Sequence, residues 1–267
     1  MDTLPLGARA TLALADTLFG TVEWVSETGS TNADVLARAL QGAPEGLVRA
    51  TEHQNAGRGR RDRRWDDEPG AALMVSVLLR PTLPPARFGR LTMAWAVAAV
   101  RACEAVTGVR LGVKWPNDLV SLADDRKVAG VLAEATFVAN APSSLPAGDA
   151  VVVIGMGLNA NGGVPAELTD RAVALAELAG APVDREGVLI ALLRHFAELY
   201  AAVDDSALDV AYGAACATIG RVVRVELDSG AITGTAVGVT PEGQLVLDLP
   251  EERRILSVGD VVHLRPV

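Results

Sequence analysis

Runs of apolar and alternating residues divide the first 218 residues into predicted strands and helices. Alternation and continuous apolar runs predict strands at residues 21–26, 46–52, 72–80, 109–114, 127–138 and 150–158. Helical periodicity predicts helices at residues 8–18, 33–41, 91–106, 169–178, 185–203 and 207–218. The segment 91–106 is apolar almost throughout, which indicates a buried helix. We therefore expect an α+β fold in which a mixed β-sheet is flanked by helices.

The pattern changes at Gly220, where the segments become short and are separated by turn residues. Strands are predicted at residues 222–227, 232–239, 245–249, 254–256 and 261–264. Five short strands in about fifty residues predict a small β-barrel of SH3-like size. The predicted organisation is a short N-terminal segment at 1–20, a larger domain at 21–218 and a small domain at 219–267.

Composition is typical of a globular protein from a reducing compartment. Half of the 267 residues are hydrophobic but only 4% are aromatic, so Ala, Val and Leu must build most of the core. The two cysteines, Cys103 and Cys216, lack metal-binding spacing and are expected to be buried thiols. The start of the chain lacks signal-peptide features, and no apolar run reaches the length of a membrane span. These features predict a soluble, cytoplasmic protein with no membrane partner.

Positive charge is concentrated in one stretch of a protein whose formal net charge is −9. The overall acidity argues against nonspecific DNA binding, so no DNA partner is expected. The segment 54–65 reads Gln-Asn-Ala-Gly-Arg-Gly-Arg-Arg-Asp-Arg-Arg-Trp. Its glycines allow a close backbone approach, its arginines offer forked donors to phosphate or carboxylate, and its tryptophan offers a flat face to a purine. A bound small anion is the favoured interpretation, and a solvated basic turn is the alternative.

Two other segments place polar groups at the ends of predicted elements. Ser30-Thr31-Asn32 precedes the helix at 33–41, where Thr31 or Asn32 is expected to cap the helix. The free N–H groups there suit a polar ligand, although an ordinary cap is the simpler explanation. Lys114-Trp115-Pro116-Asn117-Asp118 follows a strand, and a turn explains Pro-Asn-Asp but not the Lys-Trp pair before it.

Glycines in the last two strands of the larger domain indicate a flat ligand against the sheet. Strict alternation places Lys127 and Gly130 on opposite faces of their strand, and Gly130 leaves space beside the sheet. Gly155-x-Gly157-x-x-Ala160 formally fits a dinucleotide fingerprint, but no helix follows it, so a Rossmann fold is rejected. Asn159 is interpreted instead as a polar ligand contact. Segment 54–65 likewise lacks the Gly-Lys-Ser/Thr ending of a P-loop.

Five motifs in one order carry a family resemblance. They are Ser30-Thr31-Asn32, Gln54…Gly57-Arg58-Gly59-Arg60…Trp65, Lys114-Trp115-Pro116-Asn117-Asp118, Lys127…Gly130…Leu132…Glu134 and Gly155-x-Gly157-x-Asn159. From about residue 22 to the C-terminus the chain resembles biotin protein ligases. It is similar to the shorter, monofunctional members, because residues 1–20 are too few for a DNA-binding domain. The resemblance implies a catalytic domain of the class II aminoacyl-tRNA-synthetase and biotin/lipoate ligase type, followed by an SH3-like C-terminal domain.

The resemblance also implies a reaction. Such ligases condense biotin with ATP to biotinyl-5′-AMP and then transfer biotin to one lysine of a biotin carboxyl carrier protein, usually that of acetyl-CoA carboxylase. By this resemblance Arg58 and Arg60 lie beside the biotin carboxylate and the α-phosphate, and Lys127 stabilises the developing charge. These three residues are the implied catalytic residues. Mg²⁺ is expected with ATP, held largely by phosphate oxygens and water rather than by a protein metal site.

Binding roles follow from the same resemblance. Ser30, Thr31 and Gln54 are implied to hydrogen-bond the ureido ring, Gly130 and Leu132 to border the biotin, and Trp65 to stack on adenine. The full biotin-binding set is Ser30, Thr31, Asn32, Gln54, Gly57, Arg58, Gly59, Arg60, Lys127, Gly130 and Leu132. The nucleotide-binding set is Arg60, Arg63, Trp65, Asn117, Asp118, Lys127 and Asn159. Asp118 is expected to act through Mg²⁺ or by orienting a cation.

Other functions remain open at this point. A lipoate ligase shares the expected fold and the acyl-adenylate logic, and a sensor that binds biotin without transferring it is a second alternative. Lys127 and the arginine pair argue against the sensor, since a pure binder needs no cations at a reacting centre. A repressor is the least favoured reading. The assembly is open between a monomer and a homodimer, with the homodimer weakly favoured.

Overall fold

The larger domain is built on one mixed β-sheet. The computed structural model describes residues 5–60, 63–65, 67–137, 150–162, 164–257 and 259–263. In these ranges the sheet comprises β1 (Thr21–Val25), β2 (Leu47–Thr51), β3 (Ala72–Leu79), β4 (Leu111–Lys114), β5 (Asp118–Ser121), β6 (Lys127–Phe137) and β7 (Ala150–Asn159). Its order is β1-β2-β3-β7-β6-β5-β4. Only β1 and β2 pair in parallel; the other neighbours are antiparallel, which confirms the expected mixed sheet.

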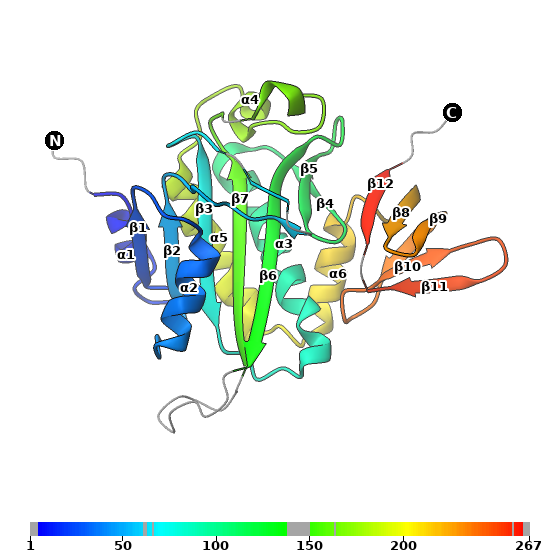
Figure 1. The fold of residues 1–267 in the computed structure, drawn as a ribbon, viewed down its shortest axis with the longest axis horizontal. Helices are drawn as coiled ribbons and strands as arrows, with labels where there is room; N and C mark the ends of the chain where they lie inside the picture. The colour runs from blue at the N-terminus through cyan, green and yellow to red at the C-terminus, as the bar shows by residue number, and fades with distance from the viewer. Residues whose placement is uncertain are drawn as a thin grey trace.

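Helices cover both faces of this sheet. The helix α2 (Thr31–Leu40) lies on one face, and α3 (Gly89–Thr107), α5 (Arg185–Ala201) and α6 (Ser206–Ala215) lie on the other (Figure 1). Successive residues of β3 explain this arrangement: Leu78 packs in the small core with Val35 of α2, whereas Val77 packs in the large core with α3 and α5. As expected, α3 is buried over most of its surface. The short α1 (Ala8–Ala13) packs against α5 and β1.

A second, antiparallel sheet forms the C-terminal part of the chain. It contains β8 (Val222–Leu227), β9 (Gly230–Val239), β10 (Leu245–Asp248), β11 (Arg253–Leu256) and β12 (Asp260–His263), in the order β11-β10-β9-β8-β12. Figure 1 shows this sheet beside α6 and β4, with the β10–β11 hairpin reaching outward. All five strands lie within three residues of their predicted bounds, and Val223, Val225 and Ala236 join the core of the larger domain.

Polar contacts fix the C-terminal sheet to the larger domain. Arg90 of α3 is fully buried and donates to the carbonyl oxygen of Pro241 at 2.9 Å, in the turn between β9 and β10. The indole N–H of Trp115 donates to the carbonyl oxygen of Gly243 in the same turn at 2.9 Å. Trp115 is thus an anchor between the two sheets, which accounts for the tryptophan before the Pro-Asn-Asp turn.

The structure corrects three predicted elements. The predicted helix at 169–178 is wrong: only α4 (Leu175–Ala179) is helical, after a short 3-10 turn at Ala166–Leu168. The intervening backbone pairs with the start of β6 instead, since the N–H of Lys127 donates to Arg171 O and the N–H of Val173 donates to Lys127 O. The strand β5 was not predicted, because its four residues are too few to show alternation. The N-terminal helix ends at Ala13, five residues early.

Candidate active site

One cavity collects nearly all the predicted site residues. It opens on the α2 face of the sheet, between the start of α2, the segment 54–65 and the central strands β6 and β7. Predicted residues that line it are Ser30, Thr31, Asn32, Gln54, Arg58, Gly59, Arg60, Arg63, Trp65, Asn117, Asp118, Lys127, Gly130 and Leu132. Two predicted residues do not line it: Gly57 lines an adjoining groove on the outer side of the segment, and Asn159 lies at the end of β7, two residues beyond Gly157.

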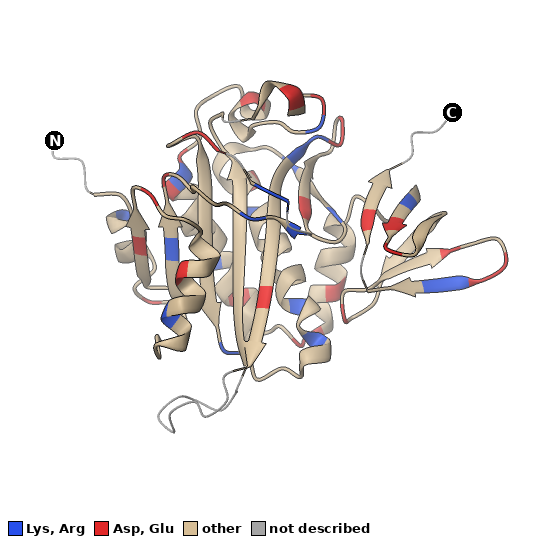
Figure 2. Cartoon of the chain, in the orientation of Figure 1, with Lys and Arg blue, Asp and Glu red and all other residues tan. Residues whose placement is uncertain are grey.

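The segment 54–65 crosses the cavity as a folded loop. The N–H of Gly59 donates to Arg63 O at 2.6 Å, and the N–H of Trp65 donates to Gly57 O at 3.0 Å. A Cβ on Gly57 would collide with the Trp65 carbonyl oxygen, so glycine is required for this fold. Figure 2 shows the basic residues of the loop over the middle of the sheet. Arg61 and Asp62 lie outside the described residues.

Trp65 lies flat against the glycines of the sheet. A Cβ built on Gly157 would lie 2.5 Å from Cε2 of the indole, and one on Gly130 would lie 3.1 Å from Cζ3. Both glycines are therefore needed for the ring to approach the strands. The indole N–H is buried, and no described group accepts a hydrogen bond from it. The space that the sequence assigned to a flat ligand is partly taken by this side chain.

A β-bulge places Lys127 over the cavity. In the pairing of β5 with β6, Asp118 lies opposite Gly130 and Leu119 opposite Ala129, but Val120 lies opposite Lys127. The extra residue shifts the alternation, so Lys127 and Gly130 share a face. The predicted opposite faces were therefore wrong. The ammonium group of Lys127 lies 2.7 Å from Asp118 and 5.4 Å from the centre of the Trp65 ring.

The turn before β5 holds Arg60. Asn117 donates from Nδ2 to Val131 O at 2.8 Å and accepts at Oδ1 from Nη1 of Arg60 at 3.0 Å. The N–H of Val131 donates to Asn117 O at 2.8 Å. Asn117 is thus fixed on β6 by two bonds and aims Arg60 along the cavity. Behind this turn, burial lowers the pKa of Lys114, against the opposing effect of Asp118 and Asp125.

The C-terminal sheet supplies a cavity residue that sequence reasoning missed. Asp260, the first residue of β12, lines the cavity and forms an ion pair with Arg63. Its Oδ1 lies 3.8 Å from Nη1 of Arg60, which also donates to Gly259 O at 3.4 Å. Nothing local distinguishes Asp260 from other strand-edge acids, because its partners lie almost 200 residues away in sequence. Met74, Val131, Met156 and Arg64 also line the cavity without having been predicted.

The opposite end of the cavity is neutral and rich in hydrogen bonds. Gln54 Oε1 accepts from the backbone N–H of Thr31 at 2.8 Å and from its hydroxyl at 3.1 Å. The predicted cap was misplaced: α2 begins at Thr31, Ser30 is the residue before it, and no side chain caps the helix. Thr31 and Asn32 are therefore free to bond across the sheet rather than to their own helix. Ser76 of β3, which was not predicted, contacts both.

The described residues contain neither a metal-binding cluster nor a membrane-spanning helix. No group of three or more His, Cys, Asp or Glu side chains among them is arranged to hold a metal ion. No helix among them is long and apolar enough to cross a bilayer. The cavity carboxylates that face the arginines are Asp118 and Asp260, and both already contact cationic side chains.

Comparisons with known proteins agree with this geometry. Residues 25–145 match the model of the biotin/lipoate A/B protein ligase family, and residues 218–264 match the biotin protein ligase C terminal domain. The chain is 38% identical to the biotin–[acetyl-CoA-carboxylase] ligase of Mycobacterium tuberculosis, over 98% of this chain and 97% of that protein. It is 31% identical to the bifunctional ligase/repressor BirA of Bacillus subtilis, over 84% of this chain and 68% of that protein.

Solved structures give the same result. The biotin protein ligase from Aquifex aeolicus in complex with biotin and ATP matches with a TM-score of 0.76 and 26% identity, and the match covers 93% of this chain and all of that chain. The biotin protein ligase from Leishmania major in complex with biotinyl-5-AMP matches with a TM-score of 0.59 over 89% of this chain. At 18% identity the second match shows the fold alone.

Proposed function

The chain belongs to the biotin protein ligases of the biotin/lipoate A/B protein ligase family, and we propose that it activates biotin with ATP and transfers it to a carrier-protein lysine. One observation carries this proposal: motif residues scattered over the first 132 positions meet in one cavity whose two ends differ in chemistry. Gln54 and Thr31 provide a neutral, hydrogen-bonding end. Arg58, Arg60, Arg63, Arg64 and Lys127 provide a cationic end.

These two ends suit the two substrates. The cyclic urea of biotin has one carbonyl and two N–H groups and fits the neutral end, where amide and hydroxyl groups converge. The valeryl chain then lies along the apolar surface of Trp65 and Leu132, which line the cavity. The carboxylate reaches the cationic end, where the α-phosphate of ATP joins it. We assign Trp65 and Asn117 to the nucleotide because both line the cavity, and Asn159, which does not line it, completes the proposed set.

The first reaction is adenylation. A carboxylate oxygen of biotin attacks the α-phosphorus of ATP, the new C–O–P bond forms, and pyrophosphate leaves with the electrons of the broken P–O bond. The carboxylate and the triphosphate repel each other, so cations must hold them together. We assign this role to Arg58, Arg60 and Lys127. Lys127 is kept in place by Asp118 at 2.7 Å, which orients its charge toward the cavity.

The second reaction transfers the biotinyl group. The neutral amine of a carrier lysine attacks the acyl carbon of biotinyl-5′-AMP, an amide forms, and AMP leaves with the former carboxylate oxygen. A second groove offers a route for that lysine, because it shares Arg60, Asn117 and Leu132 with the cavity. This groove runs between β6 and the turn Glu242–Gln244 of the C-terminal sheet. The carrier is proposed to be the biotin carboxyl carrier of acetyl-CoA carboxylase or of a related carboxylase.

Magnesium fits this site as a companion of ATP. Mg²⁺ binds through few protein carboxylates and keeps phosphate oxygens and waters as its other ligands. Asp118 and Asp260 are the carboxylates that the cavity offers. We propose that Asp118 and Asp260 would hold Mg²⁺ together with phosphate oxygens of ATP, and that the ion would supply positive charge beside the leaving pyrophosphate.

The deciding experiment is biotin-dependent exchange of labelled pyrophosphate into ATP, followed by avidin blotting of an added biotin-carrier domain. Exchange and carrier labelling by the wild type, with both lost in Lys127→Ala, would establish the ligase. Arg110→Ala is the matched control, since Arg110 is a cation with a side chain 77% exposed and outside the cavity. Exchange with lipoate but not with biotin would indicate a lipoate ligase, and biotin binding without exchange would indicate a sensor.

A homodimer is proposed as the assembly, with β6 as its contact. Beyond Ala133 the described part of β6 pairs only with β7 and lies outside the second groove, so the other edge of residues 134–137 is open to strand addition. Phe137 is 60% exposed at its end. Analytical ultracentrifugation tests this assembly: a wild-type dimer that dissociates when Ala135→Pro removes an edge-facing N–H would support it, and a monomeric wild type would contradict it.

A further inference from the structure

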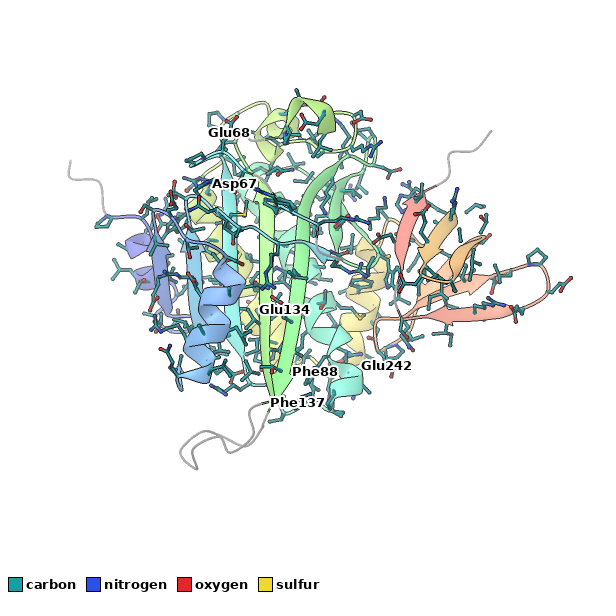
Figure 3. All side chains as sticks on the ribbon, viewed as in Figure 1. Asp67, Glu68, Phe88, Glu134, Phe137 and Glu242 are labelled. Carbon is teal, nitrogen blue, oxygen red and sulfur yellow. The ribbon has the colours of Figure 1, made fainter. Side chains whose placement is uncertain are left out.

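Glu134 has no part in the proposed chemistry and lines the adjoining groove rather than the cavity, yet its carboxylate contacts two residues that line the cavity. Figure 3 labels it on β6, in the part of the strand toward Phe137. One oxygen, Oε2, accepts from Nδ2 of Asn32 at 2.7 Å and from Nη2 of Arg58 at 3.0 Å. A single carboxylate oxygen thus contacts one side chain from the neutral end and one from the cationic end.

Glu134 determines which way the Asn32 amide faces. Its carboxylate and the carbonyl oxygen of Leu132, 3.3 Å from Nδ2, can only accept hydrogen bonds. The NH₂ group of Asn32 must therefore point toward β6 and its carbonyl oxygen toward β3. That oxygen lies 2.6 Å from the hydroxyl of Ser76, and a Cβ on Gly155 would collide with it. A flip of the Asn32 amide would turn its carbonyl oxygen toward Glu134 and Leu132, which only accept, and both of those hydrogen bonds would be lost.

The orientation of the Asn32 amide determines which hydroxyl group donates in each hydrogen bond from Ser76 to Thr31, at the neutral end of the cavity. Ser76 has one hydroxyl proton, and Asn32 Oδ1 can only accept, so Ser76 donates to Asn32. Thr31 Oγ1 lies 2.7 Å from Ser76 Oγ and 3.1 Å from Gln54 Oε1. Gln54 Oε1 also only accepts, since it faces the backbone N–H of Thr31. Because Ser76 has no second proton to give, Thr31 donates its single proton in the 2.7 Å bond to Ser76, and the Thr31 oxygen accepts none from Ser76.

Thr31 lines the cavity, so it presents lone pairs rather than a proton to a ligand. We propose that Glu134 is a positioning residue that fixes the direction of this hydrogen-bond chain. The neutral end of the cavity therefore selects a ligand that presents an N–H group. Glu134 also aims the Arg58 guanidinium at the carboxylate of the bound biotin. The inference rests on the proposed function and adds a reason for its specificity. A cyclic urea supplies the N–H that Thr31 requires, and the dithiolane ring of lipoate supplies none.

Arg58 depends on the same oxygen. Its side chain is 48% exposed and rises from a glycine-flanked loop position, so few packing contacts restrict it. Its 3.0 Å hydrogen bond to Glu134 ties the guanidinium to β6. Removing the charge of Glu134 therefore acts on both ends of the cavity, whereas removing the Ser76 hydroxyl acts on the neutral end alone.

The test compares Glu134→Gln with a closely matched control, Glu23→Gln. Glu23 on β1 also accepts from two donors through one oxygen, Nη1 of Arg38 and Nη1 of Arg49, each at 3.1 Å. Both glutamate side chains are 30% exposed, and Arg38 is 49% exposed against 48% for Arg58. Calorimetric titration with biotin is expected to show a 10- to 100-fold weaker affinity in Glu134→Gln and no change in Glu23→Gln.

Two further readouts separate positioning from a general structural effect. Biotin has two ureido nitrogens, and methylating either one removes one N–H. Of the two N-methyl isomers, the more weakly bound should bind the wild type at least tenfold more weakly than biotin does. This ratio of affinities should be smaller in Glu134→Gln. In pyrophosphate exchange, Glu134→Gln should raise KM for biotin and lower kcat, while Ser76→Ala should raise KM alone.

The outcomes distinguish the inference from the function. If the wild type binds biotin and Glu134→Gln keeps the wild-type affinity and the same ratio between biotin and its methylated analogue, the inference is wrong and the ligase function stands. If the wild type does not bind biotin, the proposed function fails and the inference fails with it. A melting temperature of Glu134→Gln equal to that of Glu23→Gln shows that both variants are folded.

Discussion

Lys127 extends its ammonium group over Gly130, three residues along the same strand, at a distance that leaves no room for a side chain. A Cβ on Gly130 would lie 2.8 Å from Nζ of Lys127. The two residues meet because the bulge between Leu119 and Val120 in the pairing of β5 with β6 removes one step of alternation. The proposed catalytic cation and the glycine that borders the cavity beneath it therefore form a single local feature.

Gly130→Ala is expected to impair biotin activation without unfolding the protein. The added methyl group must displace Lys127, Trp65 or the ligand, and overpacking of this kind costs about 1–3 kcal/mol. We expect biotin-dependent pyrophosphate exchange to fall about 10- to 100-fold in kcat/KM. Gly238→Ala on β9 is the control, since a Cβ there meets no atom within 4 Å. Equal activity of the two variants would contradict the assigned position of Lys127.

The sequence predicts that the motif residues meet in one site, but it does not predict which of their side chains contact one another. Arg58, Lys127 and Gly130 belong to residue types with direct chemical meaning at the ends or centres of recognisable elements. The bulge leaves no trace in the residue pattern of β6, because Val128, Ala129 and Val131 are all apolar. Its position is set by the pairing of β6 with β5, a strand of four residues that pattern reasoning did not find.

Long-range partners were missed for a related physical reason. Asp260 enters the cavity only because the C-terminal sheet packs beside β4, and that packing depends on contacts such as Trp115 with Gly243. The role of Ser76 depends on the register of β3 against β7, where Ser76 lies opposite Gly155. Neither relation has a local signature, since each is created by tertiary packing.

Asp260→Asn is expected to release the arginine loop from the C-terminal sheet. The carboxylate forms an ion pair with Arg63 and lies 3.8 Å from Arg60, so its charge restrains two loop arginines. Without ligands, limited trypsin digestion should cut after Arg58, Arg60 or Arg63 several times faster in the variant, because a protease needs an opened segment.

The control for this experiment is Asp248→Asn in the same sheet. Asp248 also pairs with an arginine, Arg253, in two hydrogen bonds of 2.6 and 3.1 Å, but it lies on the outward hairpin. Its loss should leave cleavage of the loop unchanged. Identical cleavage rates in the Asp260 variant and the wild type would show that the ion pair does not restrain the loop.

An introduced lysine should report whether the groove leads to activated biotin. Ala133 is exposed, lines the groove beside Leu132 and is a small residue that a lysine can replace on a strand surface. The sequence contains only two lysines, Lys114 and Lys127, so background labelling is low. With biotin and ATP, Ala133→Lys should biotinylate itself, as detected by avidin blotting and mass spectrometry of the tryptic peptide.

Position 210 provides the comparison for that variant. Val210 on α6 is 73% exposed and does not line the groove, so Val210→Lys offers an exposed amine outside it. Labelling of Ala133→Lys alone supports a guided route to the acyl group. Equal labelling of both variants would indicate that biotinyl-5′-AMP diffuses out before it reacts, and the groove would lose its proposed role.

Acid should weaken the junction between the two sheets through His263. This side chain is 4% exposed, and its ring nitrogens lie 3.0 Å from Thr218 Oγ1 and 3.1 Å from Nη1 of Arg221. Burial, Lys114 and Arg221 lower the pKa of His263 below its ordinary value of 6.5, while Asp125 opposes them. The unfolded chain therefore binds a proton at a higher pH than the folded protein does.

The sign of the pH effect follows from this difference. Where the unfolded state holds more protons than the folded state, the free energy of unfolding rises with pH. The contribution of neutral His263 to this free energy is therefore complete above pH 6.5, and it is lost as the pH falls toward the lowered pKa. Asp125, whose pKa is also lowered, titrates only below its ordinary 3.8 and does not affect this window. The melting temperature should therefore fall between pH 7.5 and pH 5.5, and His263→Gln should reduce the fall. His195→Gln, which changes a histidine 32% exposed on α5, should leave the fall unchanged; the same slope in both variants would exclude His263 as its source.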